Sequence, residues 1–194
     1  MEKNLTYVAL FAALIAVLGL IPKIDLMVGV PITAQSLGIM LCGTVLGAKR
    51  GALAVVLFLV LVAAGLPLLS GGRGGLALFS GPSAGFLFGF PVAAFVAGLI
   101  VERWEARIGV SAFVAAVVGG IVVLYAIGIP VLAAQLSTES VGKMFAKLPT
   151  YAKMPLPVAL SMLYLPGDLI KCVIAALVTQ GIAQTRPSSL LSRA

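Results

Sequence analysis

Histidine is absent from the sequence, and there are only two cysteines, Cys42 and Cys172. Histidine is the commonest metal ligand and proton shuttle in proteins, so its absence removes the simplest route to either role. The cysteines fall in apolar stretches expected to span a membrane, and they have neither the spacing of a metal site nor the number needed for a disulfide framework. We therefore expect no metal, haem or other cofactor.

The sequence also lacks the phosphate-binding pattern G-x-x-x-x-G-K-[ST]. Gly43 and Gly47 precede Lys49, but the spacing differs and no hydroxyl residue follows the lysine. The chain is therefore not expected to hydrolyse ATP. Any active transport would take its energy from an ion gradient or from a separate subunit.

Charged residues make up only 10% of the chain, whereas 61% is hydrophobic and the mean hydropathy is +1.19. Charge-free runs such as 51–72 and 108–138 exceed the roughly 20 apolar residues that cross a bilayer as a helix. A transmembrane barrel would need alternating strands and a polar lumen, which this composition does not supply. We predict an all-α polytopic membrane protein, one domain over residues 1–194, with six transmembrane helices near 5–21, 32–47, 51–69, 84–101, 110–135 and 157–180.

The distribution of Lys and Arg predicts the orientation, because cytoplasmic connections carry an excess of basic residues. With both termini in the cytoplasm of a bacterial cell, the inner-membrane side holds the larger basic set: Lys3, Lys49, Arg50, Arg103, Arg107, Arg186 and Arg193. The opposite side holds Lys23, Arg73, Lys143, Lys147 and Lys153. The net charge of +7 is then explained by this topology and by contact with anionic membrane lipid, and it does not indicate nucleic-acid binding.

Asp168 and Lys171 are the ionisable residues of an otherwise uncharged stretch, residues 156–185. Placing each charge in hydrocarbon costs about 3 kcal/mol on insertion scales. Because the two residues are three apart, they share one face of a helix. Pro166 and Gly167 just before them predict an interruption of that helix. The pair either neutralises itself to fix helix packing or lines a polar pocket, in which Asp168 accepts ligand N–H groups and Lys171 meets a carboxylate or carbonyl.

A glycine-rich segment runs from Ser70 to Gly75 and is followed by 80–85, which reads Ser-Gly-Pro-Ser-Ala-Gly. Glycine lets backbone N–H groups approach a ligand closely, and the Arg73 guanidinium suits a carboxylate. The segment is interpreted either as a lid over a pocket or as a flexible external connection whose arginine is merely solvated. Its second half also matches the G-x-S-x-G nucleophile motif, with Lys171 as the base that could activate Ser83 in a membrane hydrolase.

Small residues recur every fourth position in several of the expected helices, a spacing that lets helices approach closely. Most of these rows are expected to pack inside the bundle. The first helix would lie at the edge of the bundle, so its rows are the candidates for docking a partner protein: Ala9 with Ala13, and Ala12 with Ala16.

Four features together resemble the BioY family, the biotin-specific capture subunits of energy-coupling-factor (ECF) transporters. They are Pro31-Ile-Thr-Ala-Gln35, the run Gly74–Gly85, the pattern Tyr164-Leu-Pro-Gly-Asp-Leu-Ile-Lys171 and the alanine-rich first helix. The usual form of the second feature is closer to Gly-Pro-Thr-Gly-Gly-Tyr. Ser83, Ala84 and Phe86 depart from that form.

The resemblance implies a six-helix protein that binds biotin beneath its external connections and docks through its first helix onto a transmembrane coupling protein driven by ATPase subunits. It implies roles for Asp168 and Lys171, and biotin chemistry adds the rest of the candidate substrate-binding set: Arg73, Gln35, Gly75, Phe79, Ser83, Phe86 and Tyr164. No chemistry on the ligand is expected. The open alternative is a self-sufficient secondary transporter of a small carboxylate-bearing solute, with Asp168 as its proton site.

Overall fold

The computed structural model describes residues 2–23 and 32–193, with side chains from Asn4 onward. Residues 24–31 fall outside this description, and with them most of the first predicted external connection and Pro31 of the Pro31–Gln35 motif. No β-strand occurs among the described residues, and an isolated backbone pairing joins Leu69 and Arg73. The predicted all-α class is therefore confirmed.

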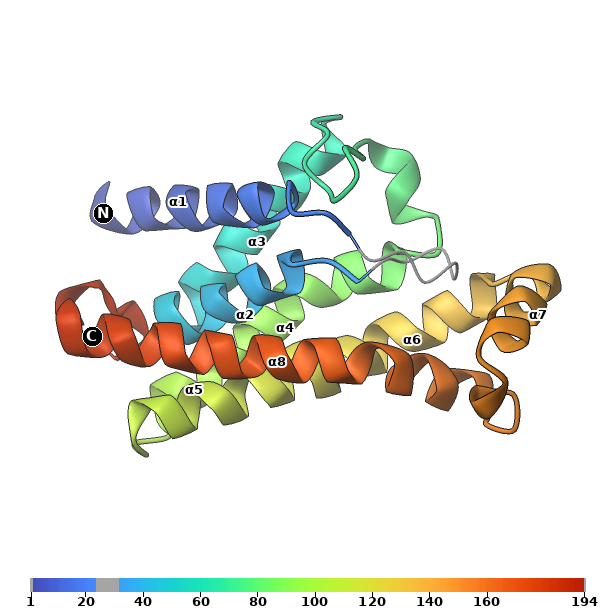
Figure 1. Ribbon diagram of the computed structural model, residues 1–194. Coiled ribbons are helices and arrows are strands. Elements are labelled where there is room, and N and C mark those ends of the chain that lie inside the picture. The colour runs from blue at the N-terminus through green and yellow to red at the C-terminus, as the bar shows by residue number, and fades with distance from the viewer. Residues whose placement is uncertain (1, 24–31, 194) are drawn as a thin grey trace.

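The helices form a bundle in which both chain termini lie at the same end (Figure 1). In chain order they are α1 (Glu2–Leu18), α2 (Gln35–Leu46), α3 (Ala48–Ala63), α4 (Ala84–Arg103), α5 (Ile108–Val117), α6 (Leu124–Gln135), α7 (Thr138–Lys147) and α8 (Leu156–Thr185). A π-helical segment, η2 (Val118–Val123), joins α5 to α6. Short 3₁₀ helices lie in the connections and near the C-terminus, at Leu76–Phe79, Pro149–Tyr151, Pro187–Ser189 and Leu191–Arg193.

Three of these helical stretches are long and apolar enough to cross a bilayer: Ala84–Arg103, Ile108–Gln135 and Leu156–Thr185. The other three helices of the predicted set, α1, α2 and α3, have 17, 12 and 16 residues. A helix of 12 residues is about 18 Å long, and one of 30 residues is about 45 Å long. The short α2 begins beside the middle of α8, where Ser36 bonds to Asp168 and Lys171, and this placement positions the site described below.

Helices α2 and α4 form the centre of the bundle: α2 packs against α1, α3, α4 and α8, and α4 packs against α2, α3, α5 and α6. Their crossing depends on glycine, because a Cβ on Gly43 would lie 2.5 Å from the carbonyl oxygen of Ala94. A row of small residues thus allows backbone-to-backbone contact here. Close packing of these two helices gives the bundle a rigid centre.

The expected interruption at Pro166 is wrong, because α8 remains helical from Leu156 to Thr185 with Pro166 inside it. Proline removes one backbone hydrogen bond, and the turns on either side of it retain theirs. Asp168 and Lys171 consequently project from regular helix. The sequence-based prediction also omitted α7, an amphipathic helix whose N-cap is Ser137.

Candidate functional site

A pocket with a cavity volume of about 70 Å³ lies among α2, α4, α6 and α8 beneath the connection from α3 to α4. This volume is below the range of about 300–1,000 Å³ that is typical of small-molecule sites. Its lining consists of Ile32, Thr33, Gln35, Ser36, Leu69, Arg73, Ser83, Phe86, Leu87, Phe90, Leu124, Tyr164, Asp168 and Lys171. The walls are mostly apolar, and the two charged residues of α8, Asp168 and Lys171, face this space.

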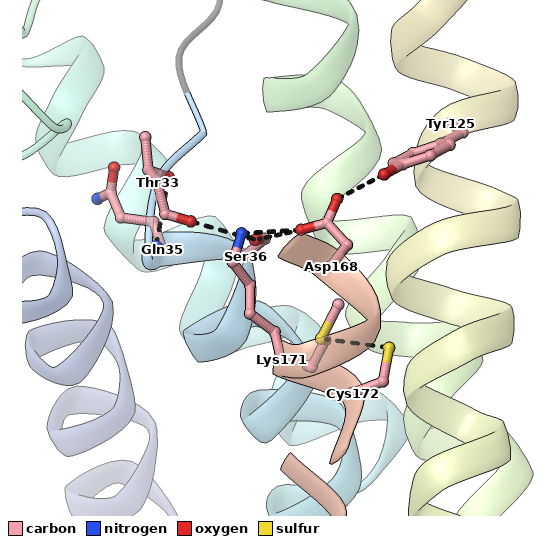
Figure 2. A network of polar contacts seen from close by, with 8 residues as sticks. Thr33, Gln35, Ser36, Tyr125, Asp168, Lys171 and Cys172 are labelled. Carbon is pink, nitrogen blue, oxygen red and sulfur yellow. Dashed lines mark hydrogen bonds and ion pairs between the residues drawn. The ribbon is translucent and has the colours of Figure 1, made fainter. Parts of the chain in front are cut away.

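Asp168 and Lys171 form an ion pair, with 2.8 Å between Lys171 Nζ and Asp168 Oδ1. Their side chains are only 9% and 13% exposed, so the pair is largely shielded. Lys171 Nζ also donates to Ser36 Oγ at 2.8 Å, and Ser36 Oγ donates to Asp168 Oδ1 at 3.3 Å (Figure 2). The pair is thus held against the N-terminal turn of α2, whose dipole favours a nearby negative charge.

The second carboxylate oxygen of Asp168 faces another helix. Tyr125, on α6, donates its hydroxyl to Asp168 Oδ2 at 2.7 Å (Figure 2). Its ring centroid lies 6.5 Å from that of Tyr164, which is in turn 6.1 Å from Phe86, both in edge-to-face geometry. These three rings line or back one wall of the pocket.

The glycine-rich segment folds as a tight turn that brings Arg73 to the pocket. Gly71 and Gly72 have φ values of 81° and 69°, which side chains other than glycine rarely adopt. The turn is closed by two backbone bonds between Leu69 and Arg73, at 3.0 and 3.1 Å. Arg73 Nε donates to Ser70 O at 3.2 Å, and no carboxylate in the described part of the chain pairs with its guanidinium.

Gln35 ties this turn to the helices around it. Its side-chain nitrogen donates to Ile15 O at 3.2 Å and to Leu68 O at 3.0 Å, while its oxygen accepts from Ser70 N at 3.0 Å. The residue is only 2% exposed although it borders the pocket. Its bonds go to backbone groups, so the structure gives Gln35 the role of an anchor for the wall that carries Arg73.

The structure brings together seven of the nine predicted substrate-binding residues: Gln35, Arg73, Ser83, Phe86, Tyr164, Asp168 and Lys171. The other two lie outside the lining. Gly75 has a φ of 99° and donates its N–H to Val62 O, so it shapes the backbone of the connection and does not contact the pocket. Phe79 packs its ring against the exposed Phe88, with centroids 5.8 Å apart.

Sequence reasoning missed Ser36 and Tyr125, the two hydroxyl groups that bond to Asp168. A signal existed for Tyr125, because it is one of the few polar side chains in the charge-free run 108–138. Ser36 follows the Pro31–Gln35 motif directly. Neither position could be paired with Asp168 without knowing how the helices pack.

An apolar helical bundle with a small-molecule pocket, lined by a shielded ion pair at the middle of its longest helix, defines a multi-pass membrane protein that binds a small polar solute. The chain belongs to the BioY family, whose model matches residues 2–188.

Related proteins agree over nearly the full length. The chain is 52% identical to the biotin transporter BioY of Rhodobacter capsulatus, with 100% of both chains covered. It is 39% identical to the probable biotin transporter BioY of Bacillus subtilis, over 93% of this chain and 90% of the relative. A crystal structure described as the S-component for biotin from an ECF-type ABC transporter superposes with a TM-score of 0.78, at 29% identity, covering 95% of this chain and 92% of that one.

Proposed function

We propose that this protein captures biotin in the pocket beside Asp168 and Lys171 and supplies it to an ATP-driven ECF module. Membership of the BioY family supports the ligand and the transport role. The single structural observation that carries the proposal is the ion pair of α8 facing an otherwise apolar pocket. The protein is a transport protein and not an enzyme, and biotin is its transported ligand rather than a cofactor.

The two ends of biotin match two parts of the lining. Its ureido N–H groups are donors, so they suit Asp168, and its ring and aliphatic chain suit the walls formed by Phe86 and Tyr164. Its carboxylate needs a cation. Lys171 is already engaged by Asp168 and Ser36, whereas Arg73 has bonded only its Nε to a backbone oxygen. We therefore assign the carboxylate to Arg73, with Lys171 holding Asp168.

The sequence has no phosphate-binding loop, so ATP-driven transport by this chain would need separate ATPase subunits. We infer that a transmembrane coupling protein and its ATPase subunits bind along α1. Ala9 and Ala13 are exposed on this helix, whereas Ala12 is only 3% exposed and Ala16 is partly buried. The open row is therefore Ala9 with Ala13, and Ala12 belongs to the core.

We further infer that the protein lies in the bacterial inner membrane with both termini in the cytoplasm. The common end of the two termini in the bundle supports this orientation, as does the excess of Lys and Arg at that end (Figure 1). The pocket would then open toward the outer side, where a capture protein meets its ligand.

The family membership favours this function over the two alternatives. A Ser83–Lys171 hydrolase would need an unprotonated lysine, but Lys171 is paired with Asp168 at 2.8 Å. A self-sufficient secondary transporter would need Asp168 to exchange protons during uptake. Vesicles that contain this chain alone test that reading: uptake abolished by a proton uncoupler would support it, and uptake seen only with the ATPase partners would support capture.

Equilibrium binding of biotin to the purified full chain in lipid nanodiscs tests the proposal directly. We expect tight binding at one site, weakened by Asp168→Asn and by Lys171→Ala, with no binding of thiamine as a control vitamin. A parent protein that binds no biotin would overturn the assignment.

Docking is tested by co-purification with the coupling protein and ATPases. Ala9→Leu with Ala13→Leu should abolish co-purification while biotin binding persists, and Ala134→Leu, at an exposed site on α6, should change neither. Retained co-purification of the α1 variant would refute the α1 surface.

A further inference from the structure

We propose that Tyr125 is a positioning residue for the ligand: it holds the Asp168 carboxylate in the orientation that receives the ligand's N–H group. This proposal rests on the proposed function, because it concerns the same site. It goes beyond the pocket lining, since Tyr125 lies behind Asp168 and is not part of the lining.

The donors around Asp168 occupy its two oxygens unequally. Oδ1 accepts from Lys171 Nζ at 2.8 Å and from Ser36 Oγ at 3.3 Å. Oδ2 accepts from Tyr125 Oη at 2.7 Å. A carboxylate has about four acceptor positions, two on each oxygen. The described donors fill both positions of Oδ1 and one of Oδ2, so the remaining position for a ligand N–H is on Oδ2.

Tyr125 restrains the Asp168 carboxylate from the side opposite Lys171 and Ser36. The carboxylate is planar, so rotation about its Cβ–Cγ bond moves both oxygens together, and Lys171 and Ser36 restrain this rotation at Oδ1 alone. The hydroxyl of Tyr125 approaches from α6 and fixes that rotation (Figure 2). A ligand N–H then meets an acceptor whose direction is set before binding, which reduces the ordering cost of association.

Tyr125 is itself firmly placed. The residue is 9% exposed, and its ring packs edge-to-face on Tyr164 with centroids 6.5 Å apart. It is the second residue after η2, the π-helical segment Val118–Val123. A π-helical turn contains more residues than an α-helical turn, so it rotates the residues that follow it around the helix axis. Here the residues after η2 point Leu124 into the pocket lining and Tyr125 onto Asp168.

The test replaces Tyr125 in the full-length protein with three side chains of similar size. Tyr125→Phe removes the hydroxyl, 4-methylphenylalanine keeps the volume without a donor, and 4-aminophenylalanine returns a donor at the same place. Biotin affinity is measured by calorimetry in nanodiscs, and the melting temperature of the ligand-free protein is measured beside it. Tyr7→Phe is the matched control, because Tyr7 also donates one side-chain bond, to Ser189 Oγ at 3.2 Å, far from the pocket.

We expect Tyr125→Phe and the 4-methyl variant to weaken biotin binding about tenfold to a hundredfold, the value of one hydrogen bond to a charged group. The 4-amino variant should recover most of this loss, and Tyr7→Phe should stay within about twofold of the parent. The factor for Tyr125→Phe should be the same for biotin and for biotin methyl ester, because Tyr125 acts at the end of the ligand that meets Asp168.

The outcomes separate this proposal from the proposed function. A parent that binds biotin together with a Tyr125→Phe variant of equal affinity would overturn the role of Tyr125 and leave the function standing. Equal losses in all three variants, with lowered melting temperatures, would also overturn it, because packing and not the donor would then matter. A parent that binds no biotin would remove both proposals together.

Discussion

Arginine makes different numbers of bonds to the fold at the two ends of the bundle. At the end that holds the termini, Arg193 donates to the carbonyl oxygens of Trp104 and Ala106, at 2.5 and 3.1 Å, and also to Ser111 Oγ. At the pocket end, Arg73 makes one bond, from Nε to the nearby Ser70 O. The first guanidinium makes three bonds to the fold through Nη2, and the second makes one through Nε, which leaves its two terminal nitrogens for a ligand.

The same contrast extends to the neighbouring polar groups. Near the termini, Ser192 Oγ donates to Thr44 O at 2.6 Å and Arg50 donates to Leu191 O at 3.1 Å, so the C-terminal segment ties α2 and α3 together. In the pocket, Asp168 retains an acceptor position on Oδ2. Polar and charged side chains near the termini thus bond to the fold, whereas those in the pocket keep donor or acceptor positions for a ligand. These remaining positions distinguish the binding site.

Removing the pocket's acid should have the largest effect. Asp168→Asn leaves the Lys171 ammonium without its counter-ion in a shielded position, where breaking a pair costs about 3–5 kcal/mol of stability. We expect biotin affinity to fall by about a hundredfold or more, since the acceptor for the ligand's N–H loses its charge. Calorimetry gives the affinity, and thermal unfolding in detergent gives the stability.

The chain supplies a matched control for that change. Lys143 and Glu139 form an ion pair on α7 at 2.5 Å, but their side chains are 65% and 76% exposed. Glu139→Gln should therefore change stability by less than about 1 kcal/mol and leave affinity unaltered. If Asp168→Asn changed affinity and stability as little as Glu139→Gln, the proposed difference between the pocket pair and an exposed ion pair would be refuted.

Replacing Gln35, which anchors the pocket wall, should have the next largest effect. Gln35→Ala leaves Ile15 O, Leu68 O and Ser70 N without their side-chain partner. We expect the free energy of unfolding to fall by about 2–3 kcal/mol, as buried backbone groups lose hydrogen bonds. Biotin binding should weaken as well, because the turn that carries Arg73 is no longer fixed.

Gln184→Ala is the control for the anchor, because Gln184 is exposed on α8. Its effect on the unfolding free energy should stay within about 0.5 kcal/mol. Equal melting temperatures for the two variants would show that the bonds of Gln35 do not stabilise the wall.

Changing the available arginine should have a moderate and ligand-dependent effect. Arg73→Gln should weaken biotin binding about tenfold, the value of a charge-assisted bond, but should scarcely alter binding of biotin methyl ester. Arg103→Gln, at an exposed site far from the pocket, should alter neither. An equal loss of affinity for biotin and for its methyl ester would show that the biotin carboxylate does not bind Arg73.

The parts of the site that lie on one helix could be predicted from the sequence. Asp168 and Lys171 stand out because charges are rare in an apolar stretch, and helix geometry alone places residues three apart on one face. Tyr125 could not be paired with Asp168, because 43 residues separate them and the direction of Tyr125 follows a π-helical segment that apolar periodicity does not reveal.

The glycine-rich segment was predictable only in part. Its composition indicated an external connection near a pocket, and Arg73 does line the pocket, while its role in binding stays a prediction. The course of the chain after the turn depends on how Leu76–Phe79 packs, and this takes Gly75 and Phe79 away from the pocket. The continuity of α8 through Pro166 was likewise beyond a local rule, since the loss of one backbone bond is tolerated within a long helix.

The smallest effect is expected when two phenylalanines of the candidate set, Phe86 and Phe79, are each replaced by leucine. Phe86 lines the pocket and packs against Tyr164, whereas Phe79 packs against Phe88 outside it. Phe86→Leu should weaken biotin binding by about two- to tenfold, because an aromatic pair is worth about 0.5–1.5 kcal/mol beyond its buried area. Phe79→Leu should leave affinity within about twofold of the parent, because Phe79 does not line the pocket. The reverse order of effects would place the ligand under the connection at Phe79 and would contradict the pocket as described, because a leucine at either position preserves the apolar character and changes only the aromatic contact.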